Sequence, residues 1–448
     1  MTNPRKISSI LSQFIFETEY EHIPASVIHE AKRSLINYFA VCFAAGTDDT
    51  ISKAIQVYQS FSSNSIASVI GRNIKTDILN AAALNAMSAN VFDFDDTHIP
   101  TIIHPTAPVA AALFALSQQL RLNGRAFLLA HVLGVDIECR IGNAVSPQHY
   151  SRGWHITSTC GVFGAAIAAG KAMGLNVKQL LWTIGNASSQ ASGLVETLGT
   201  MSKSISVGNA ARNGLLSALL AKNDFSGPDL PLEGERGFLN VYGQELDFVA
   251  LQNNLGFDWE IQKNTYKPYP CGVVLNPVIE ACLELFVTLQ EKNIDFRNIE
   301  VIKLTGHPLL RQRTDRPSIL TGRESQVSAQ HAVGIVLLKG KAGLPEFSDE
   351  AIKNTTVKWI GSKVKFFDDP KMSVDAATVE IAFVDKSKLI TQISKAKGSL
   401  SVPLSDHDLE KKLISLSSNA AFPINTHKLI DQIWSIDSAD DVSLILDV

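Results

Sequence analysis

The sequence DFDDTHIPTIIHP, residues 93–105, carries side chains suited to proton transfer. Histidine is the residue that most often moves protons near neutral pH, and a neighbouring carboxylate orients or tunes the imidazole. The polar residues of this run are Asp93, Asp95, Asp96, Thr97, His98 and His104. Asp93 also continues a core-facing helical stripe from Ile78, where an unpaired carboxylate is costly. The simpler alternative is a helix end with solvated acids and a proline-rich turn.

A second polar segment, GWHITST at 153–159, interrupts an apolar region. It precedes a predicted helix for which Ser158 or Thr159 would be the N-cap, so His155 is expected in a loop beside a helix N-terminus. Such a position favours a bound anion. The alternative is a packed tryptophan–histidine pair with a capping role.

Two lysines stand in segments that join the predicted elements. Lys203 lies in a predicted loop, 199–209, where the alternative is a solvated side chain. Lys267 begins KPYPCG at a predicted domain boundary, and the two prolines of this segment would hold the lysine in place. Both lysines are therefore candidates for binding carboxylates.

The spacing of the acids and histidines argues against a metal site. The sequence has no HExxH motif, and a DDxxD magnesium motif starting at Asp95 fails because Ile99 occupies the third acidic position. Neither GxGxxG nor GxxxxGK[ST] occurs, so no phosphate-binding loop is predicted. We expect neither a metal nor an organic cofactor.

Hydrophobic periodicity predicts a mainly α protein with two domains. Apolar residues at helical spacing fill residues 1–266 and return after 401, which predicts one all-helical domain made of both stretches. Its expected helices are 25–44, 76–92, 108–122, 124–145, 161–174, 178–194, 209–220, 406–415 and 425–436. Residues 267–400 are predicted to form a smaller α+β domain. The strands expected there are 299–305, 356–360, 364–367, 377–383 and 388–393, with helices at 276–289 and 325–338.

Composition excludes several classes of protein. The 448 residues carry a net charge of −4, and no basic run favours nucleic acid as a partner. The N-terminus lacks the apolar core of a signal peptide, and the longest apolar stretches fall short of the roughly 18 residues that span a membrane. Five dispersed cysteines indicate free thiols. We expect a cytoplasmic protein that is not bound to membranes.

Five segments, in this order, resemble the MmgE/PrpD family. They are DFDDTH…HP at 93–105, GWH-x-T at 153–157, K-x-x-x-x-G-N-A-A at 203–211, KPYPC at 267–271 and TGRESQVSAQHA at 321–332. This family includes 2-methylcitrate dehydratase, cis-aconitate decarboxylase and iminodisuccinate epimerase. The resemblance implies a large helical domain with an inserted α+β lid, a homodimer, an active site in the cleft between the domains and no organic cofactor.

The resemblance also implies roles for individual residues. Matching positions give a catalytic set of Asp93, His104, His155, Lys203 and Lys267. Substrate contacts are expected from Thr97, His98, Ser206, Arg323 and His331. This sequence departs from the family where many relatives have histidine at the position of Ser206 and tyrosine at that of His331, and where relatives often have histidine near Asn276.

These groups fit chemistry at the carbon beside a carboxylate. Removing that proton needs a base, and cations must hold the charge that develops. We expect His104 or His155 to transfer the proton, Asp93 to orient an imidazole and the lysines to bind the carboxylates of a small polycarboxylic acid. The predicted enzyme is a lyase resembling 2-methylcitrate dehydratase. The alternatives are an iminodisuccinate-type epimerase, with His331 as a second base, a cis-aconitate decarboxylase-like lyase, a magnesium-dependent helical enzyme and a non-catalytic helical binding protein.

Overall fold

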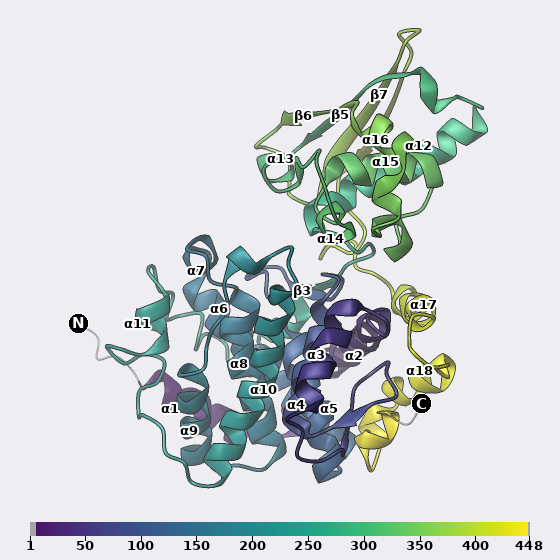
Figure 1. Ribbon diagram of the computed structural model, residues 1–448. Helices are drawn as coiled ribbons and strands as arrows, with labels where there is room; N and C mark the ends of the chain where they lie inside the picture. Colours follow the sequence, from purple (N-terminus) through teal and green to yellow (C-terminus); the bar gives the residue numbers. More distant parts are fainter. Residues whose placement is uncertain (1–5, 447–448) are drawn as a thin grey trace. The chain divides into compact units, whose positions relative to one another are not determined.

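The computed structural model describes residues 6–446, which form two compact units (Figure 1). The helical unit contains residues 6–91, 95–264 and 405–446, and the α+β unit contains 92–94 and 265–404. The predicted boundaries, 266/267 and 400/401, lie within four residues of these breaks. The prediction of a mainly α protein is confirmed.

The helical unit is built from long, buried helices. Its helices are α1 (Ile7–Glu17), α2 (Ala25–Ala44), α3 (Asp49–Gln59), α4 (Ile78–Asn90), α5 (Thr106–Leu120), α6 (Gly124–Val145), α7 (Gln148–Ser151), α8 (Ile156–Ala172), α9 (Val177–Ser188), α10 (Ser202–Lys222), α11 (Phe238–Tyr242), α17 (Asp406–Ser417) and α18 (Thr426–Trp434). A small antiparallel pair, β1 (Ala67–Ser68) with β2 (Lys75–Thr76), was not predicted. The short strand β3 (Asp96–His98) lies between α4 and α5.

Helix α8 is at the centre of this unit and packs against α5, α6, α9 and α10. Nearly all of its residues are small or apolar and buried on every side, as expected for a helix surrounded by others. A methyl group on Gly134 of α6 would lie 2.7 Å from the carbonyl oxygen of Gly164 on α8. Glycine at Gly134 therefore lets the two backbones approach closely, and this fixes where the N-terminus of α8 lies.

The chain's last helices complete the helical unit. Figure 1 shows α17 and α18 in yellow beside the purple α2, and both helices pack on α2. Ser405 and Asp408 form a capping box that starts α17. Arg33 of α2 pairs with Asp406, and Lys412 donates to Asn37 at 2.8 Å.

The α+β unit is a four-stranded sheet with helices. Its strands are β5 (Ile299–Gly306), β6 (Val364–Asp368), β7 (Ala377–Phe383) and β8 (Lys388–Ile393), and its helices are α12 (Asn276–Glu291), α13 (Pro308–Thr314), α14 (Gly322–Ser325), α15 (Ala329–Lys339) and α16 (Thr355–Gly361). The sheet order is β6-β5-β7-β8, with β5 parallel to β6 and antiparallel to β7. Buried and partly exposed residues alternate along β7, so one sheet face supplies the core.

Helix α12 covers the buried side of β7 and β8 and packs on α15. Among the described residues, its segment Val273–Glu291 is the one helix long and apolar enough to cross a membrane, judged by length and composition alone. More than half of that segment is buried inside the protein, as in the core helix of a folded domain. Its apolar residues belong to the core of the α+β unit.

One predicted strand, 356–360, is wrong, because these residues form helix α16. Threonine, valine, tryptophan and isoleucine favour strands, but the Asn354 side chain caps the helix by accepting from Val357 N at 3.1 Å. Val357 and Ile360 then face α15, and a methyl group on Gly334 of α15 would lie 2.4 Å from the Val357 carbonyl oxygen. Packing thus overrides the local preference for a strand.

Candidate active site

His104 ends a tight loop that follows β3. The backbone of this loop closes on itself, because His98 N donates to Ile103 O and Ile102 N donates to His98 O, each at 2.8 Å. Ile102 has φ +59°, a conformation that is strained for a β-branched residue. A methyl group on Gly142 of α6 would lie 2.5 Å from Ile103 Cδ1, so the loop also needs a glycine beneath it.

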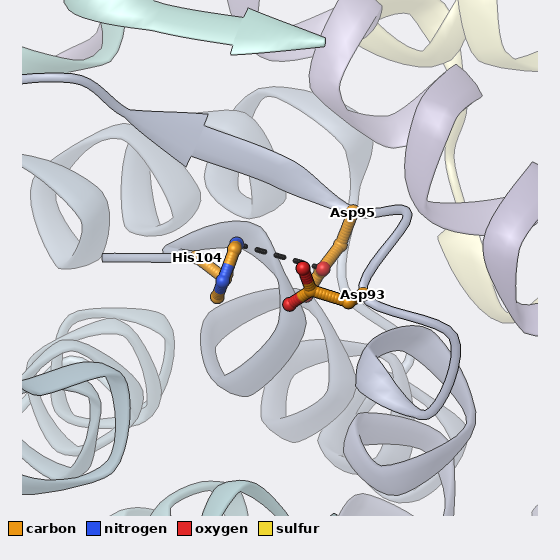
Figure 2. Close-up of side chains that lie close together, drawn as sticks. All are labelled: Asp93, Asp95 and His104. Carbon is orange, nitrogen blue, oxygen red and sulfur yellow. Dashed lines mark ion pairs between the residues drawn. The ribbon is translucent and has the colours of Figure 1, made fainter. Parts of the chain in front are cut away.

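The His104 ring is oriented by the strand that precedes it. Its Nδ1 lies 2.7 Å from the carbonyl oxygen of Asp96, 3.3 Å from Thr97 Oγ1 and 3.5 Å from Asp95 Oδ1. The dashed line in Figure 2 marks the Asp95–His104 pair. A carbonyl oxygen only accepts, so Nδ1 must carry a hydrogen. In the neutral ring the lone pair is then on Nε2, which makes Nε2 the basic atom.

Asp95 and Asp96 are both buried in the helical unit. Asp95 Oδ2 accepts from Asn90 Nδ2 at 2.7 Å. Asp96 Oδ2 accepts from Thr106 Oγ1 at 2.6 Å and from Asn264 Nδ2 at 2.9 Å. Burial raises the pKa of Asp96 to about 7, and the nearby Asp95 adds to this rise while the Thr106 hydrogen bond opposes it.

His98 is fully buried, and both of its ring nitrogens have protein partners. Its Nδ1 lies 2.7 Å from Thr101 Oγ1 and its Nε2 lies 2.9 Å from Glu260 Oε2. Burial lowers the pKa of His98, so we assign a neutral ring that donates Nε2–H to the carboxylate. These contacts favour a structural role over the predicted contact with substrate.

His155 is the N-cap residue of α8. Its backbone nitrogen donates to Gly193 O at 3.0 Å, and its Nδ1 lies 2.9 Å from Ser158 Oγ and 3.2 Å from Ser206 Oγ. The prediction that Ser158 or Thr159 caps this helix is wrong, because the helix begins at Ile156 and both residues lie in its first turn. The predicted location of His155 beside a helix N-terminus is confirmed.

Lys203 lies in the first turn of α10, so the predicted loop at 199–209 is wrong from Ser202 onward. Its carbonyl oxygen accepts from Ser206 Oγ at 2.8 Å, one helical turn later. Ser206 in turn reaches His155, so the start of α10 is joined to the start of α8.

Thr157 connects the two histidine segments, because its Oγ1 accepts from the backbone nitrogen of His104 at 3.2 Å. A continuous chain of contacts therefore runs from His104 through Thr157 to the N-terminus of α8, and on through Ser206 to Lys203. The helical unit thus brings together three separate segments of the sequence, which carry Thr97 and His104, His155, and Lys203 and Ser206.

Asp93 and Lys267 pair within the α+β unit. Lys267 is 3% exposed, and its Nζ lies 2.6 Å from the Asp93 carbonyl oxygen and 3.0 Å from Asp93 Oδ2. Figure 2 also draws Asp93, in the segment that follows α4. The prediction that Asp93 continues the stripe of that helix is wrong, because α4 ends at Asn90 and Asp93 has φ +53°. Aspartate tolerates this left-handed conformation better than most residues.

The other two predicted substrate-binding residues also belong to the α+β unit. Arg323 lies in α14. His331 is in the first turn of α15, is 5% exposed and has its Nε2 2.7 Å from the Glu346 carbonyl oxygen. Burial lowers the pKa of this ring, which packs against Phe347. These contacts favour a structural role for His331 over that of a second base.

Three residues of the candidate site were not predicted from the sequence. The Glu260 carboxylate accepts hydrogen bonds from His98, Asn143 and Lys263. Gly193 and Ser158 both form hydrogen bonds with His155. The sequence carries no local signal for Glu260 because it lies 162 positions from its histidine partner. Ser158 was predicted only as a possible N-cap.

All five cysteines are free and buried, which confirms the prediction of unpaired thiols.

Comparison with known families adds a decisive observation. The family model described as the MmgE/PrpD N-terminal domain matches residues 9–250, and the one described as the MmgE/PrpD C-terminal domain matches residues 269–435. The chain belongs to the MmgE/PrpD family of enzymes. Together these matches cover most of the chain, and the predicted family resemblance is confirmed.

This MmgE/PrpD family member is similar along nearly its whole length to curated lyases. It is 24% identical to a cis-aconitate decarboxylase of Mus musculus, with 98% of this chain and 93% of the relative aligned. It is 26% identical to a cis-aconitate decarboxylase of Aspergillus terreus, over 96% of this chain and 92% of the relative. A "Cis-aconitate decarboxylase-like protein oryM" of Aspergillus oryzae is also 26% identical, over 98% and 96%.

Proposed function

We propose that this enzyme transfers a proton at the carbon beside a carboxylate of a small polycarboxylic acid. The observation that carries the proposal is the pair of histidines in the helical unit, His104 and His155, connected through Thr157. Nδ1 of His104 is held as a donor by the Asp96 carbonyl oxygen, so Nε2 is its proton-accepting atom. The relatives from Mus musculus and Aspergillus terreus add support, because they are named as decarboxylases of cis-aconitate, a tricarboxylate.

Among the possible reactions, we favour decarboxylation. The curated relatives named above are all cis-aconitate decarboxylases or decarboxylase-like, and each aligns with nearly the whole chain. In such a reaction a carbon–carbon bond breaks and carbon dioxide leaves. The electron pair remains on the substrate as a carbanion conjugated with a second carboxylate. An imidazolium Nε2–H protonates this carbanion to give the product, which leaves a neutral imidazole. Dehydration of a 2-methylcitrate-like substrate is the second candidate, because a neutral imidazole Nε2 is equally able to remove the proton that starts it.

In this proposal the cationic side chains bind the carboxylates of the substrate. Lys203, fixed by the first turn of α10, binds a substrate carboxylate and stabilises negative charge as it develops. Lys267 and Arg323 of the α+β unit are proposed to bind further carboxylates, and Asp93 to act with Lys267. We also propose a cytoplasmic homodimer without metal or organic cofactor. Size-exclusion chromatography with light scattering tests the oligomeric state.

The reaction is tested by incubating the purified protein in D₂O with separate samples of cis-aconitate, 2-methylcitrate, citrate and iminodisuccinate. Proton NMR follows the substrate, and released carbon dioxide is trapped in parallel. Carbon dioxide with a deuterated product identifies the decarboxylase, a new alkene without carbon dioxide the dehydratase, and deuterium uptake with inversion the epimerase. A repeat with EDTA is expected to give the same rate. No change on any substrate would favour a binding protein over an enzyme of this class.

A further inference from the structure

The surroundings of His155 determine which of its two nitrogens is basic. Two hydroxyl oxygens lie near its Nδ1, Ser158 Oγ at 2.9 Å and Ser206 Oγ at 3.2 Å. Each hydroxyl also has a backbone carbonyl oxygen within reach. Ser158 Oγ lies 3.0 Å from His155 O, and Ser206 Oγ lies 2.8 Å from Lys203 O.

A count of hydrogens favours one tautomer. Each serine has a single hydroxyl hydrogen, and a carbonyl oxygen can only accept. If both serines donate to their carbonyls, both oxygens can accept from Nδ1–H, and every hydrogen is used. If Nδ1 instead carries the lone pair, only one hydroxyl can donate to it after leaving its carbonyl. The other oxygen then faces Nδ1 lone pair to lone pair, and this repulsion costs free energy.

Gly193 packs against His155 and the two serines. Its carbonyl oxygen accepts from His155 N, and its φ is +132°. A methyl group at Gly193 would lie 2.1 Å from Ser158 Oγ and 3.2 Å from Ser206 Cβ. Ser158 is therefore enclosed, whereas Ser206 lies beside it and is partly exposed. A serine at 206 thus supplies a hydroxyl to His155 from a different helix.

We propose that Ser206 and Ser158 are positioning residues that hold His155 as its Nδ1-protonated tautomer, so that Nε2 is the nitrogen presented to the substrate. Ser206 then acts through His155 and not as the predicted substrate contact. His155 is then the same tautomer as His104, whose Nδ1 donates to the Asp96 carbonyl oxygen. The catalytic consequence rests on the proposed function, whereas the tautomer itself does not.

The tautomer is measured by NMR on protein with ¹⁵N-labelled histidine, because the two ring nitrogens of each neutral tautomer differ widely in chemical shift. His155→Gln assigns the signal, as it is the one that disappears. We expect Nδ1–H in the wild type and a shift towards Nε2–H in Ser206→Ala and, more strongly, in Ser158→Ala/Ser206→Ala. Ser204→Ala is the matched control, because its buried hydroxyl is on the same helix and has no hydrogen-bond partner among the described residues.

The kinetic test separates positioning from binding. We expect kcat to fall roughly 10-fold in Ser206→Ala and roughly 100-fold in the double variant, with little change in KM, because proton transfer at Nε2, in either direction, starts from or leaves a neutral ring with Nδ1–H. Alanine favours helices, so Ser206→Ala is expected to fold. An unchanged His155 tautomer in the folded double variant would overturn the inference. Wild-type Nδ1–H without turnover of any carboxylate would instead overturn the proposed function alone.

Discussion

His98 Nε2 lies 2.9 Å from Glu260 Oε2, although 162 positions separate the two residues in the sequence. The same carboxylate accepts from Asn143 at 3.1 Å and from Lys263 at 2.7 Å. Burial alone would raise the pKa of Glu260, but the hydrogen bonds from His98 and Lys263 lower it to about 2. This ionised glutamate therefore ties the loop that ends at His104 to the short 3₁₀ turn Glu260–Lys263.

The first prediction concerns this pair. Glu260→Gln should destabilise the protein at pH 7 by about 2 kcal/mol, because a charged acceptor is lost from a buried histidine. A lowered pKa gives stability that is present above the ordinary glutamate value and is lost as the pH falls towards about 2. The difference in Tm between variant and wild type, measured by calorimetry, should therefore shrink below pH 4. Glu350→Gln, at an exposed ion pair, is the control. A difference that stays constant from pH 3 to pH 7 would contradict the prediction.

A second prediction uses the opposite shift at Asp96. Its pKa is raised from 3.8 to about 7, so the unfolded chain loses this proton at lower pH than the native protein does. The contribution of Asp96 to stability therefore declines as the pH rises from about 4 to about 7, and it is constant above that. Asp96→Asn keeps an oxygen that accepts from Thr106 and Asn264 and cannot ionise. The Tm of the variant relative to the wild type should rise between pH 5 and pH 8. If the two curves run parallel, Asp96 titrates alike in both states.

A third prediction tests the support beneath the His104 loop. Gly142→Ala places a methyl group against Ile103 Cδ1 and should cost about 1–3 kcal/mol. Ile103→Val removes that Cδ1 atom and alone should cost about 1 kcal/mol. The double variant should therefore lose less free energy of unfolding than the two single variants lose together, as measured by thermal unfolding. Strict additivity would show that the two positions do not meet.

The fourth prediction concerns turnover. His104→Gln and His155→Gln should each lower kcat about 100-fold or more while the circular dichroism spectrum stays unchanged, because each removes a proton-transfer group. His407→Gln is a matched control, since this side chain is 71% exposed on α17. Wild-type rates for either active-site variant would remove that histidine from the mechanism.

The sequence predicts regular elements well where hydrophobic periodicity and terminal signals agree. Helices α2 and α6 and strands β7 and β8 begin and end at the predicted residues. Asn123, for example, caps α6 through its side chain, and a local signal of this kind is visible in the sequence. The segment Thr355–Gly361 shows the limit, because its contacts with α15 lie in another part of the chain.

In the candidate site, too, local features could be predicted from the sequence, whereas contacts between distant segments could not. His104 and His155 could be selected as proton-transfer candidates because imidazoles stand out among apolar neighbours. Their tautomers could not, because these depend on the Asp96 carbonyl oxygen and on Ser206, which approach only after folding. His98 was predicted to contact the substrate, and its contacts with Thr101 and Glu260, which indicate a structural role, become visible only in the folded protein.

The packing of α17 on α2 has a consequence for the order of events during protein synthesis. Residues 265–404 of the α+β unit form one unbroken stretch, which emerges from the ribosome before α17 does. The helical unit instead waits for residues 405–446, since Arg33 and Asn37 of α2 have their partners there. During translation, the α+β unit is therefore able to fold while α2 still exposes the surface that α17 will cover. During that interval the exposed surface makes the nascent chain prone to aggregation.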